Sequence, residues 1–285
     1  MKFISLTLYF MLVVHVIGCH KPNKTLRLAD SRYDLENPRI IKLPNALDEI
    51  SGIDYYSKDS SLFAIVDEDG LFYKIPLTPT SKIKSWRFDK KHDFEDVVRH
   101  DSLFYVLISN GDIETIRFTN NDSIYTSMTK FPGGDKKINE FETLFYDDKS
   151  GKVVIVCKKC EDDDKKTISA WDYDIGRKEY TKSTFSIDMV TVEGSLGEDK
   201  SRLKPSAAAV NPITGDIYIL ASVNHLLVIT DRGGKIKQFF QLDPELYKQA
   251  EGITFTPKGD MIISNESHKT GNANILIIKN KKNGT

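Results

Sequence analysis

Residues 251–266, Glu-Gly-Ile-Thr-Phe-Thr-Pro-Lys-Gly-Asp-Met-Ile-Ile-Ser-Asn-Glu, hold two short apolar runs separated by a turn that contains proline and glycine. Four similar units precede this one and open at Ser51, Glu95, Glu142 and Ser206. The five openers are spaced 44, 47, 64 and 45 residues apart. Three of these steps are close to the roughly 40–45 residues of a four-stranded propeller blade, so the repeat predicts a β-propeller.

Each unit contains further strand-like runs, with turn residues between them. The fourth unit has four runs, at 207–210, 217–221, 226–230 and 236–242, whereas the last unit has only three after its opener. We expect residues 39–43, Arg-Ile-Ile-Lys-Leu, to supply the missing outer strand and to close the ring, because closure removes unpaired sheet edges. The prediction is an all-β domain of five four-stranded blades.

A six-bladed ring is the alternative to five blades. The sixth blade would have to lie within the 64-residue step, where residues 188–204 are too polar and glycine-containing to supply one easily. This stretch enters the fourth unit from the rim of the openers. It is therefore a candidate lid over the channel mouth, or a disordered insertion.

The N-terminus has the pattern of an export signal. Met1-Lys2 is followed by an apolar run at 3–17, which is short for a membrane span. Residues 16–19, Val-Ile-Gly-Cys, resemble a bacterial lipobox, which implies cleavage before Cys19 and lipidation of its thiol; an ordinary secretory signal is the alternative. We predict a signal peptide at 1–18, a lipidated Cys19 with a tether at 19–38, and the propeller at 39–285. His20 replaces the aspartate that retains lipoproteins in the inner membrane, which favours the outer membrane, facing the periplasm.

Polar residues recur at two places in the units, at the opener of the first strand and directly after the second. These places share one rim because the first two strands of a blade are antiparallel neighbours, and residues two before an opener share its face. The predicted mouth contains nine acids and three bases, in a chain of net charge −1. The acids are Glu49, Asp67, Glu68, Asp93, Glu95, Glu140, Glu142, Glu251 and Glu266, and the bases are Lys158, Lys159 and Lys204.

Carboxylates held close together repel one another unless a cation joins them, and oxygen ligands from separate loops suit Ca²⁺. We therefore predict a Ca²⁺ site whose candidate ligands are Glu49, Asp67, Glu68, Glu95, Glu142, Glu251 and Glu266. Lys158 is a candidate contact for an anionic ligand, or a partner of Glu142. The alternative is that Glu95, Glu142 and Glu251 are a device of the fold, accepting hydrogen bonds from the backbone of the neighbouring blade.

Two cysteines remain in Cys157-Lys-Lys-Cys160, too few for a zinc site without further ligands. A local disulfide, or one core and one loop cysteine, is the expectation. None of the six histidines lies in a recognisable nucleophile–base pattern. The near-neutral charge predicts no general attraction to nucleic acid, and we expect a monomer.

The chain resembles the SdiA-regulated family, also called YjiK/CarP-like β-propeller proteins. The resemblance covers about residues 40–280 and rests on the order and spacing of several short motifs rather than on any one. These are Glu49-Ile-Ser-Gly-Ile53 with Val66-Asp-Glu-Asp-Gly70, Phe94-Glu-Asp-Val97, Phe141-Glu142, Pro205-Ser206 with Asn211-Pro212, and Glu251-Gly-Ile253 with Ser264-Asn-Glu266. It implies a secreted or envelope-anchored propeller with a link to calcium. More distantly, such propellers look like phytases and lactonases, but no motif here matches their catalytic residues.

Three functions follow as hypotheses. The first is an envelope-anchored binding or sensing protein with an acidic, Ca²⁺-binding channel mouth and a small ligand. The second is a metal-dependent hydrolase of a phosphoester or lactone, with Ca²⁺ as Lewis acid. The third is a scaffold that binds another envelope protein across the rim.

Overall fold

The composition of the strands follows their depth in the structure. The second strands of the blades are mostly apolar and buried, and β3 (Ser61–Val66) and β17 (Ile217–Ala221) are buried along their whole length. Outermost strands such as β5 (Lys84–Arg87) are polar and largely exposed. Strands covered on both faces need continuous apolar runs, so this gradient indicates blades packed face to face. The computed structural model describes residues 32–78, 81–119, 122–133, 138–161, 163–164, 166–192, 202–267 and 272–281.

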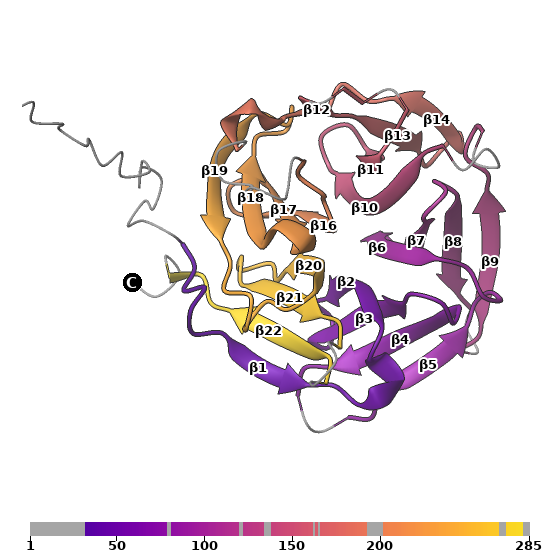
Figure 1. Cartoon of the computed structure of the whole chain (residues 1–285). Coiled ribbons are helices and arrows are strands. Elements are labelled where there is room, and N and C mark those ends of the chain that lie inside the picture. The colour runs from indigo at the N-terminus through magenta and orange to yellow at the C-terminus, as the bar shows by residue number, and fades with distance from the viewer. Residues whose placement is uncertain are drawn as a thin grey trace, which may run out of the picture.

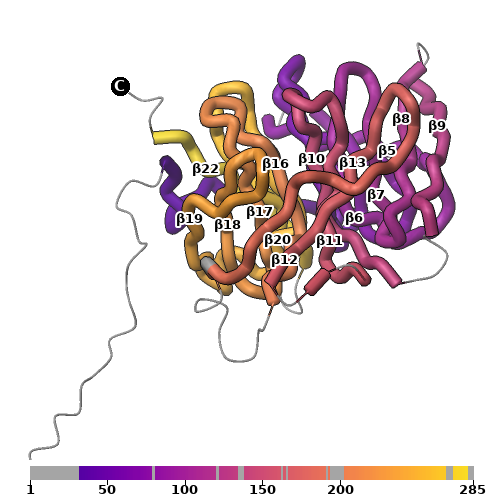
Figure 2. The backbone as a smooth tube through the Cα atoms, turned by 90° about the horizontal axis from the view of Figure 1, so that it is seen from above, coloured from indigo at the N-terminus to yellow at the C-terminus, as the bar shows by residue number. Residues whose placement is uncertain are grey.

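Five antiparallel sheets of four strands each stand around a central channel (Figure 1). Listed from the channel outward, they are β2–β5 (Ile50–Tyr56, Ser61–Val66, Leu71–Pro76, Lys84–Arg87), β6–β9 (Phe94–His100, Leu103–Ile108, Ile113–Phe118, Ile124–Thr129), β10, β11, β13 and β14 (Glu140–Asp147, Lys152–Lys159, Ala170–Asp174, Glu179–Lys182), β16–β19 (Ala207–Val210, Ile217–Ala221, Leu226–Thr230, Ile236–Gln241), and β20, β21, β22 and β1 (Ala250–Phe255, Met261–Asn265, Asn274–Ile278, Arg39–Lys42). Seen from the side, β5–β9 stand at one side of the ring and β16–β22 at the other (Figure 2).

The predicted closure is confirmed. Strand β1 pairs antiparallel with β22, with Ile40 opposite Leu276, and so completes the last blade. The long step between the third and fourth openers holds a two-stranded sheet, β12 (Thr167–Ile168) with β15 (Ile187–Asp188), and no sixth blade among the described residues. The ring therefore has five blades, and residues 193–201 of the predicted lid lie outside the described residues.

Apolar side chains fill the spaces between neighbouring blades. Between the first two blades, Phe63 stacks on Phe72 with ring centroids 5.1 Å apart, and Phe104 of the second blade lies 4.5 Å from Phe63. Edge and offset contacts of this kind add to the stability that burial itself provides. The inner strands contact one another in the order β2, β6, β10, β16, β20 and back to β2, and so surround the channel.

The N-terminal signal and Cys19 lie outside the described residues. Tyr33, within the stretch predicted as tether, is buried, pairs with Asn280 in an isolated bridge and donates its hydroxyl to the Gly259 carbonyl at 2.7 Å. The folded domain therefore extends beyond residue 39 toward the N-terminus.

The described helices are three short 3₁₀ turns, η1 (Asn45–Leu47), η3 (Met189–Thr191) and η5 (Ser222–Asn224). No helix in the described part of the chain has the length and apolar composition of a membrane span.

Candidate functional site

Acidic side chains from four of the five blades meet in one cavity at a mouth of the channel. The cavity has a volume of about 200 Å³. We call it the acidic mouth, and its lining consists of Ser51, Asp67, Asp93, Glu95, Glu140, Glu142, Lys158, Glu251 and Glu266. Seven carboxylates thus face one lysine, in a chain whose total charge is −1.

Most of the residues predicted for this rim come together here. The cavity lining includes five of the seven predicted ligands, namely Asp67, Glu95, Glu142, Glu251 and Glu266, together with Lys158. Glu68 instead points to Lys91, with Oε2 3.3 Å from the lysine Nζ, and its side chain is 61% exposed. Glu49 is absent from the lining. Burial raises the pKa of the Glu266 carboxyl, and the nearby charge of Glu49 raises it further.

β-Bulges aim the glutamates at the channel. In β6 the pairing with β7 skips Glu95, since Phe94 lies opposite Ile108 and Asp96 opposite Leu107. The same register shift passes over Glu142 in β10 and over Glu251 in β20. A bulge inserts an extra residue and re-aims its side chain, so three inner strands each present a glutamate at the same level.

Glycine permits the close approach of blades beside these bulges. A Cβ atom on Gly52 would lie 2.5 Å from both Asp96 Oδ1 and the backbone N of Val97, in the next blade. A Cβ on Gly252 would lie 2.5 Å from the Ser51 carbonyl oxygen of the first blade. The Ser51-Gly52 and Glu251-Gly252 pairs therefore combine a mouth residue with a residue whose lack of a side chain allows the contact.

Side chains that lie one to three residues after the openers Ser51, Glu95 and Glu251 bond to the backbone of neighbouring blades. Asp96 accepts the backbone N–H of Leu144 at 3.0 Å from the third blade, and Asp54 accepts that of Arg99 at 3.1 Å from the second. Thr254 accepts the N–H of Tyr55 at 3.2 Å. No described backbone N–H donates to the side chain of Glu95, Glu142 or Glu251. Asp96, Asp54 and Thr254 thus make the interblade backbone bonds that the sequence alternative assigned to the glutamates. Within the described part of the chain, Glu251 bonds across the blades only to a side chain, that of Ser222.

Lys158 neutralises one side of the acidic mouth. Its ammonium group contacts the Glu142 carboxylate and lies 3.0 Å from Glu140 Oε1, and the lysine side chain is 22% exposed. Of the two roles that the sequence left open, the structure shows the pairing with Glu142. The remaining carboxylates, of Asp67, Asp93, Glu95, Glu251 and Glu266, form no salt bridge with a described residue.

Burial and mutual repulsion raise the pKa values of several of these carboxyl groups, so that they keep their protons to a higher pH. Burial, with the charges of Asp93 and Asp67, raises the pKa of Glu95 to about 9. Burial and the adjacent Asp93 carboxyl raise the pKa of Asp67 to about 7. For Glu251, burial and the charge of Glu266 raise the pKa to about 7. An entering cation would displace such protons, because it stabilises the ionised form.

The carboxylates are close but do not form a finished coordination shell. Among the described residues, only Cys157, Cys160 and Asp163 bring three potential ligand atoms within 4.8 Å of one another, and a disulfide joins the two cysteines. That group therefore offers no thiolate. The acidic mouth instead contains Asp67 Oδ1, which is buried and has no hydrogen-bond partner in the described part of the chain. A buried oxygen of this kind is normally satisfied by a donor, a water or an ion.

No protein-family model matches the chain, and no curated protein does. Solved structures do resemble it. Glutaminyl cyclase from Myxococcus xanthus superposes with a TM-score of 0.56 at 13% identity, covering 85% of this chain and 94% of that one. Luciferin-regenerating enzyme gives a TM-score of 0.51 at 9% identity over 85% and 95% of the two chains. The PQQ-bound aldose sugar dehydrogenase from Streptomyces coelicolor gives 0.50 at 10% identity over 85% and 98%.

At these identities the likeness shows the β-propeller fold alone. The resemblance to the SdiA-regulated family therefore rests on the motifs in the sequence.

Proposed function

We propose that the acidic mouth binds a divalent cation, with Ca²⁺ as the preferred ion, and that the protein is a Ca²⁺-dependent binding or sensing propeller. The observation that carries this proposal is the convergence of seven carboxylates and one lysine on a cavity of about 200 Å³. Repulsion on this scale destabilises the fold unless it is offset, and a cation offsets it directly.

The donor chemistry fits Ca²⁺ better than a softer metal. Every charged candidate in the lining, apart from Lys158, offers carboxylate oxygen, and the lining contains neither histidine nor cysteine. Ca²⁺ takes six to eight oxygen ligands in irregular geometry, whereas Zn²⁺ favours nitrogen and sulfur. Asp67, Glu95 and Glu251 would hold the ion, with Asp93 and Glu266 beside them. Bound there, Ca²⁺ would supply a positive centre for an anionic group of a ligand.

Calorimetric titration of the full-length protein tests the proposal. Ca²⁺ should bind saturably at pH 7 and more tightly than Mg²⁺, which demands stricter geometry. Binding should release protons, because the pKa values of Glu95, Asp67 and Glu251 are raised to about 9, 7 and 7. The release is measured by repeating the titration in two buffers of different ionisation enthalpy.

Paired variants locate the site. Glu95→Gln with Glu251→Gln should abolish the Ca²⁺ heat, whereas Glu179→Gln with Glu245→Gln, which changes two exposed glutamates, should leave it intact. Absence of Ca²⁺ binding to the wild-type protein would overturn the proposal. Equal affinity in the two double variants would place the ion elsewhere.

The same proposal places the protein in the bacterial envelope as a member of the SdiA-regulated family, attached to the membrane by a lipid on Cys19. The support is the lipobox-like sequence at 16–19. Incorporation of a labelled fatty acid should occur in the wild-type protein and disappear in Cys19→Ser. Equal labelling of both proteins, or of neither, would contradict the anchor. Hydrolysis of a phosphoester or lactone stays a prediction of the sequence.

A further inference from the structure

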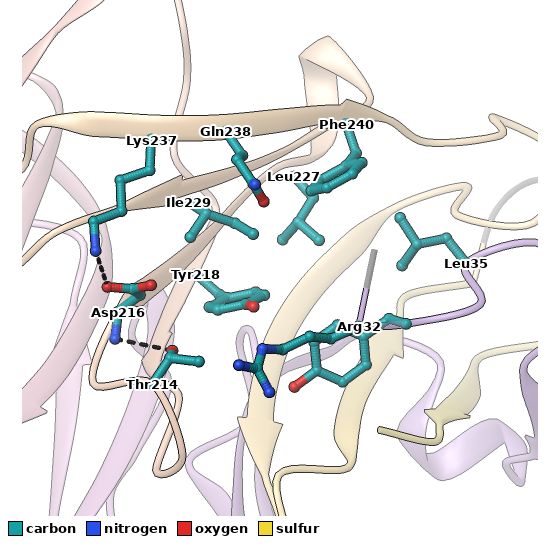
Figure 3. Close-up of a pocket in the computed structure, with 11 residues that line it drawn as sticks. Arg32, Leu35, Thr214, Asp216, Tyr218, Leu227, Ile229, Lys237, Gln238 and Phe240 are labelled. Atoms are coloured by element: carbon teal, nitrogen blue, oxygen red, sulfur yellow. Dashed lines mark hydrogen bonds and ion pairs between the residues drawn. The ribbon is translucent and has the colours of Figure 1, made fainter. Parts of the chain in front are cut away.

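A second cavity lies between the fourth blade and the segment that precedes β1, away from the acidic mouth. Its volume is about 250 Å³. Figure 3 shows its lining: Leu227 and Ile229 of β18 and Phe240 of β19 form an apolar surface, Tyr218 of β17 lies across it, and Arg32 and Leu35 close it from the N-terminal segment. We call it the blade-side pocket.

Three polar side chains point into this pocket without a partner among the described residues. The guanidinium group of Arg32 extends toward Tyr218 and Thr214, and the amide of Gln238 points down between β19 and Tyr218 (Figure 3). No described residue exchanges a hydrogen bond with the side chains of Arg32, Gln238 or Tyr218. Tyr218 is only 3% exposed and lines the pocket, so a molecule in the pocket could bond to its hydroxyl.

The other charges of the pocket cancel. Lys237 Nζ lies 2.5 Å from Asp216 Oδ1, and this pair occupies one end of the lining. Arg32 is therefore the one lining charge without an ion-pair partner among the described residues, and its single positive charge matches a single negative charge on a ligand. These features select a monoanion. A guanidinium group presents parallel N–H donors that match the two oxygens of a carboxylate.

The pocket walls are held in place before any ligand arrives. Lys281 donates its backbone N–H to the Arg32 carbonyl at 2.8 Å, and Tyr247 donates its hydroxyl to the Leu35 carbonyl at 2.8 Å. Between them, Tyr33 packs its ring edge-on against Tyr218 with centroids 5.8 Å apart and accepts a hydrogen bond from Asn211. A preformed site loses little conformational entropy on binding.

We propose that the blade-side pocket binds a small monocarboxylate with an apolar, ring-sized body. The carboxylate would accept hydrogen bonds from the Arg32 guanidinium group and the Tyr218 hydroxyl, with the Gln238 amide beside them, and the body would lie on Leu227, Ile229 and Phe240. The volume of about 250 Å³ is just below the range of roughly 300–1,000 Å³ that is typical of drug-sized ligands, so the ligand is small.

Burial raises the pKa of Tyr218 to about 12, so its hydroxyl remains a donor at neutral pH.

Benzoate, phenylacetate and hexanoate serve as probes, with their neutral amides as controls, and binding to the full-length protein is measured by saturation-transfer NMR and calorimetry. At least one acid should bind more tightly than its amide. Arg32→Gln should weaken that acid about tenfold or more, and Tyr218→Phe, which keeps the ring, by about threefold to tenfold.

Arg177→Gln removes an arginine whose side chain is 77% exposed, and it should leave the affinity for the acid unchanged. The Glu95→Gln, Glu251→Gln variant should also bind the acid as tightly as the wild type does. If no acid binds better than its amide, the inference is wrong. It is equally wrong if Arg32→Gln retains full affinity while the protein stays folded by circular dichroism.

Discussion

Replacing Glu95 with glutamine should stabilise the metal-free protein by an amount that grows with pH. Burial and the charges of Asp93 and Asp67 raise the pKa of Glu95 from 4.5 to about 9. Since the folded-state pKa lies above the unfolded value, the folded protein holds a proton that the unfolded chain has already released. The stability that Glu95 contributes is fully present below pH 4.5 and is lost as the pH rises toward 9.

The magnitude follows from the width of this window. One pKa unit corresponds to about 1.4 kcal/mol, so between pH 4.5 and 7 the titration of an isolated group would remove about 3 kcal/mol from the free energy of unfolding. Glu95 is partly exposed and its neighbours titrate with it, which reduces the difference to about 1–3 kcal/mol. Glutamine has nearly the same shape as glutamate and does not titrate. The free energy of unfolding of Glu95→Gln should therefore not fall in this way between pH 4.5 and 7.

Urea unfolding in the presence of a chelator, followed by the fluorescence of Trp86 in β5 and Trp171 in β13, measures the effect at several values between pH 5 and pH 8. The free-energy difference between Glu95→Gln and the wild type should rise across the series. Glu179→Gln, an exposed glutamate on β14, should show a flat difference. A Glu95→Gln difference that is independent of pH, or a variant that is less stable than the wild type throughout, would contradict the raised pKa of Glu95.

Substitutions at three further positions test the geometry around the mouth. Gly52→Ala should lower the free energy of unfolding by about 1–3 kcal/mol, because its Cβ would lie 2.5 Å from Asp96 Oδ1 and from Val97 N. Urea unfolding at pH 6 checks this, and unchanged stability would contradict the close approach. Asp96→Ala should cost a similar 1–3 kcal/mol in the same assay, since it leaves the Leu144 N–H without an acceptor, and Asp96→Asn should recover most of the loss. Lys158→Met should raise Ca²⁺ affinity in calorimetry by about threefold to tenfold, because it removes a nearby positive charge. Weaker Ca²⁺ binding in Lys158→Met would show that the lysine organises the site.

The architecture was predictable because it repeats. Openers at a regular spacing reveal the blades, and the unit that lacks a strand identifies its partner at Arg39–Lys42. The position of the acidic residues also follows from the repeat, since the opener and the end of the second strand must share a rim. Asp93 and Glu140 lie in the cavity for this reason, two residues before Glu95 and Glu142.

The finer arrangement depends on features that the repeat does not encode. A bulge at Glu95 aims two consecutive side chains inward, so that the glutamate faces the mouth and Asp96 bonds to the next blade. The glycines that follow Ser51 and Glu251 were the signal for such bulges, because glycine inside a strand often marks one. The blade-side pocket had no such signal, since Arg32 and Tyr218 are brought together only by closure of the ring.

Thermal unfolding of the full-length protein with Ca²⁺ and with chelator tests the central claim most directly. Ca²⁺ at a hundred times its dissociation constant should add about 2.7 kcal/mol of stability to the folded state, with a rise in melting temperature that Mg²⁺ does not match. The Glu95→Gln, Glu251→Gln variant should show no rise. The cation site at the acidic mouth would be contradicted if Ca²⁺ did not change the melting temperature of the wild type. It would also be contradicted if the double variant showed the same rise in melting temperature as the wild type.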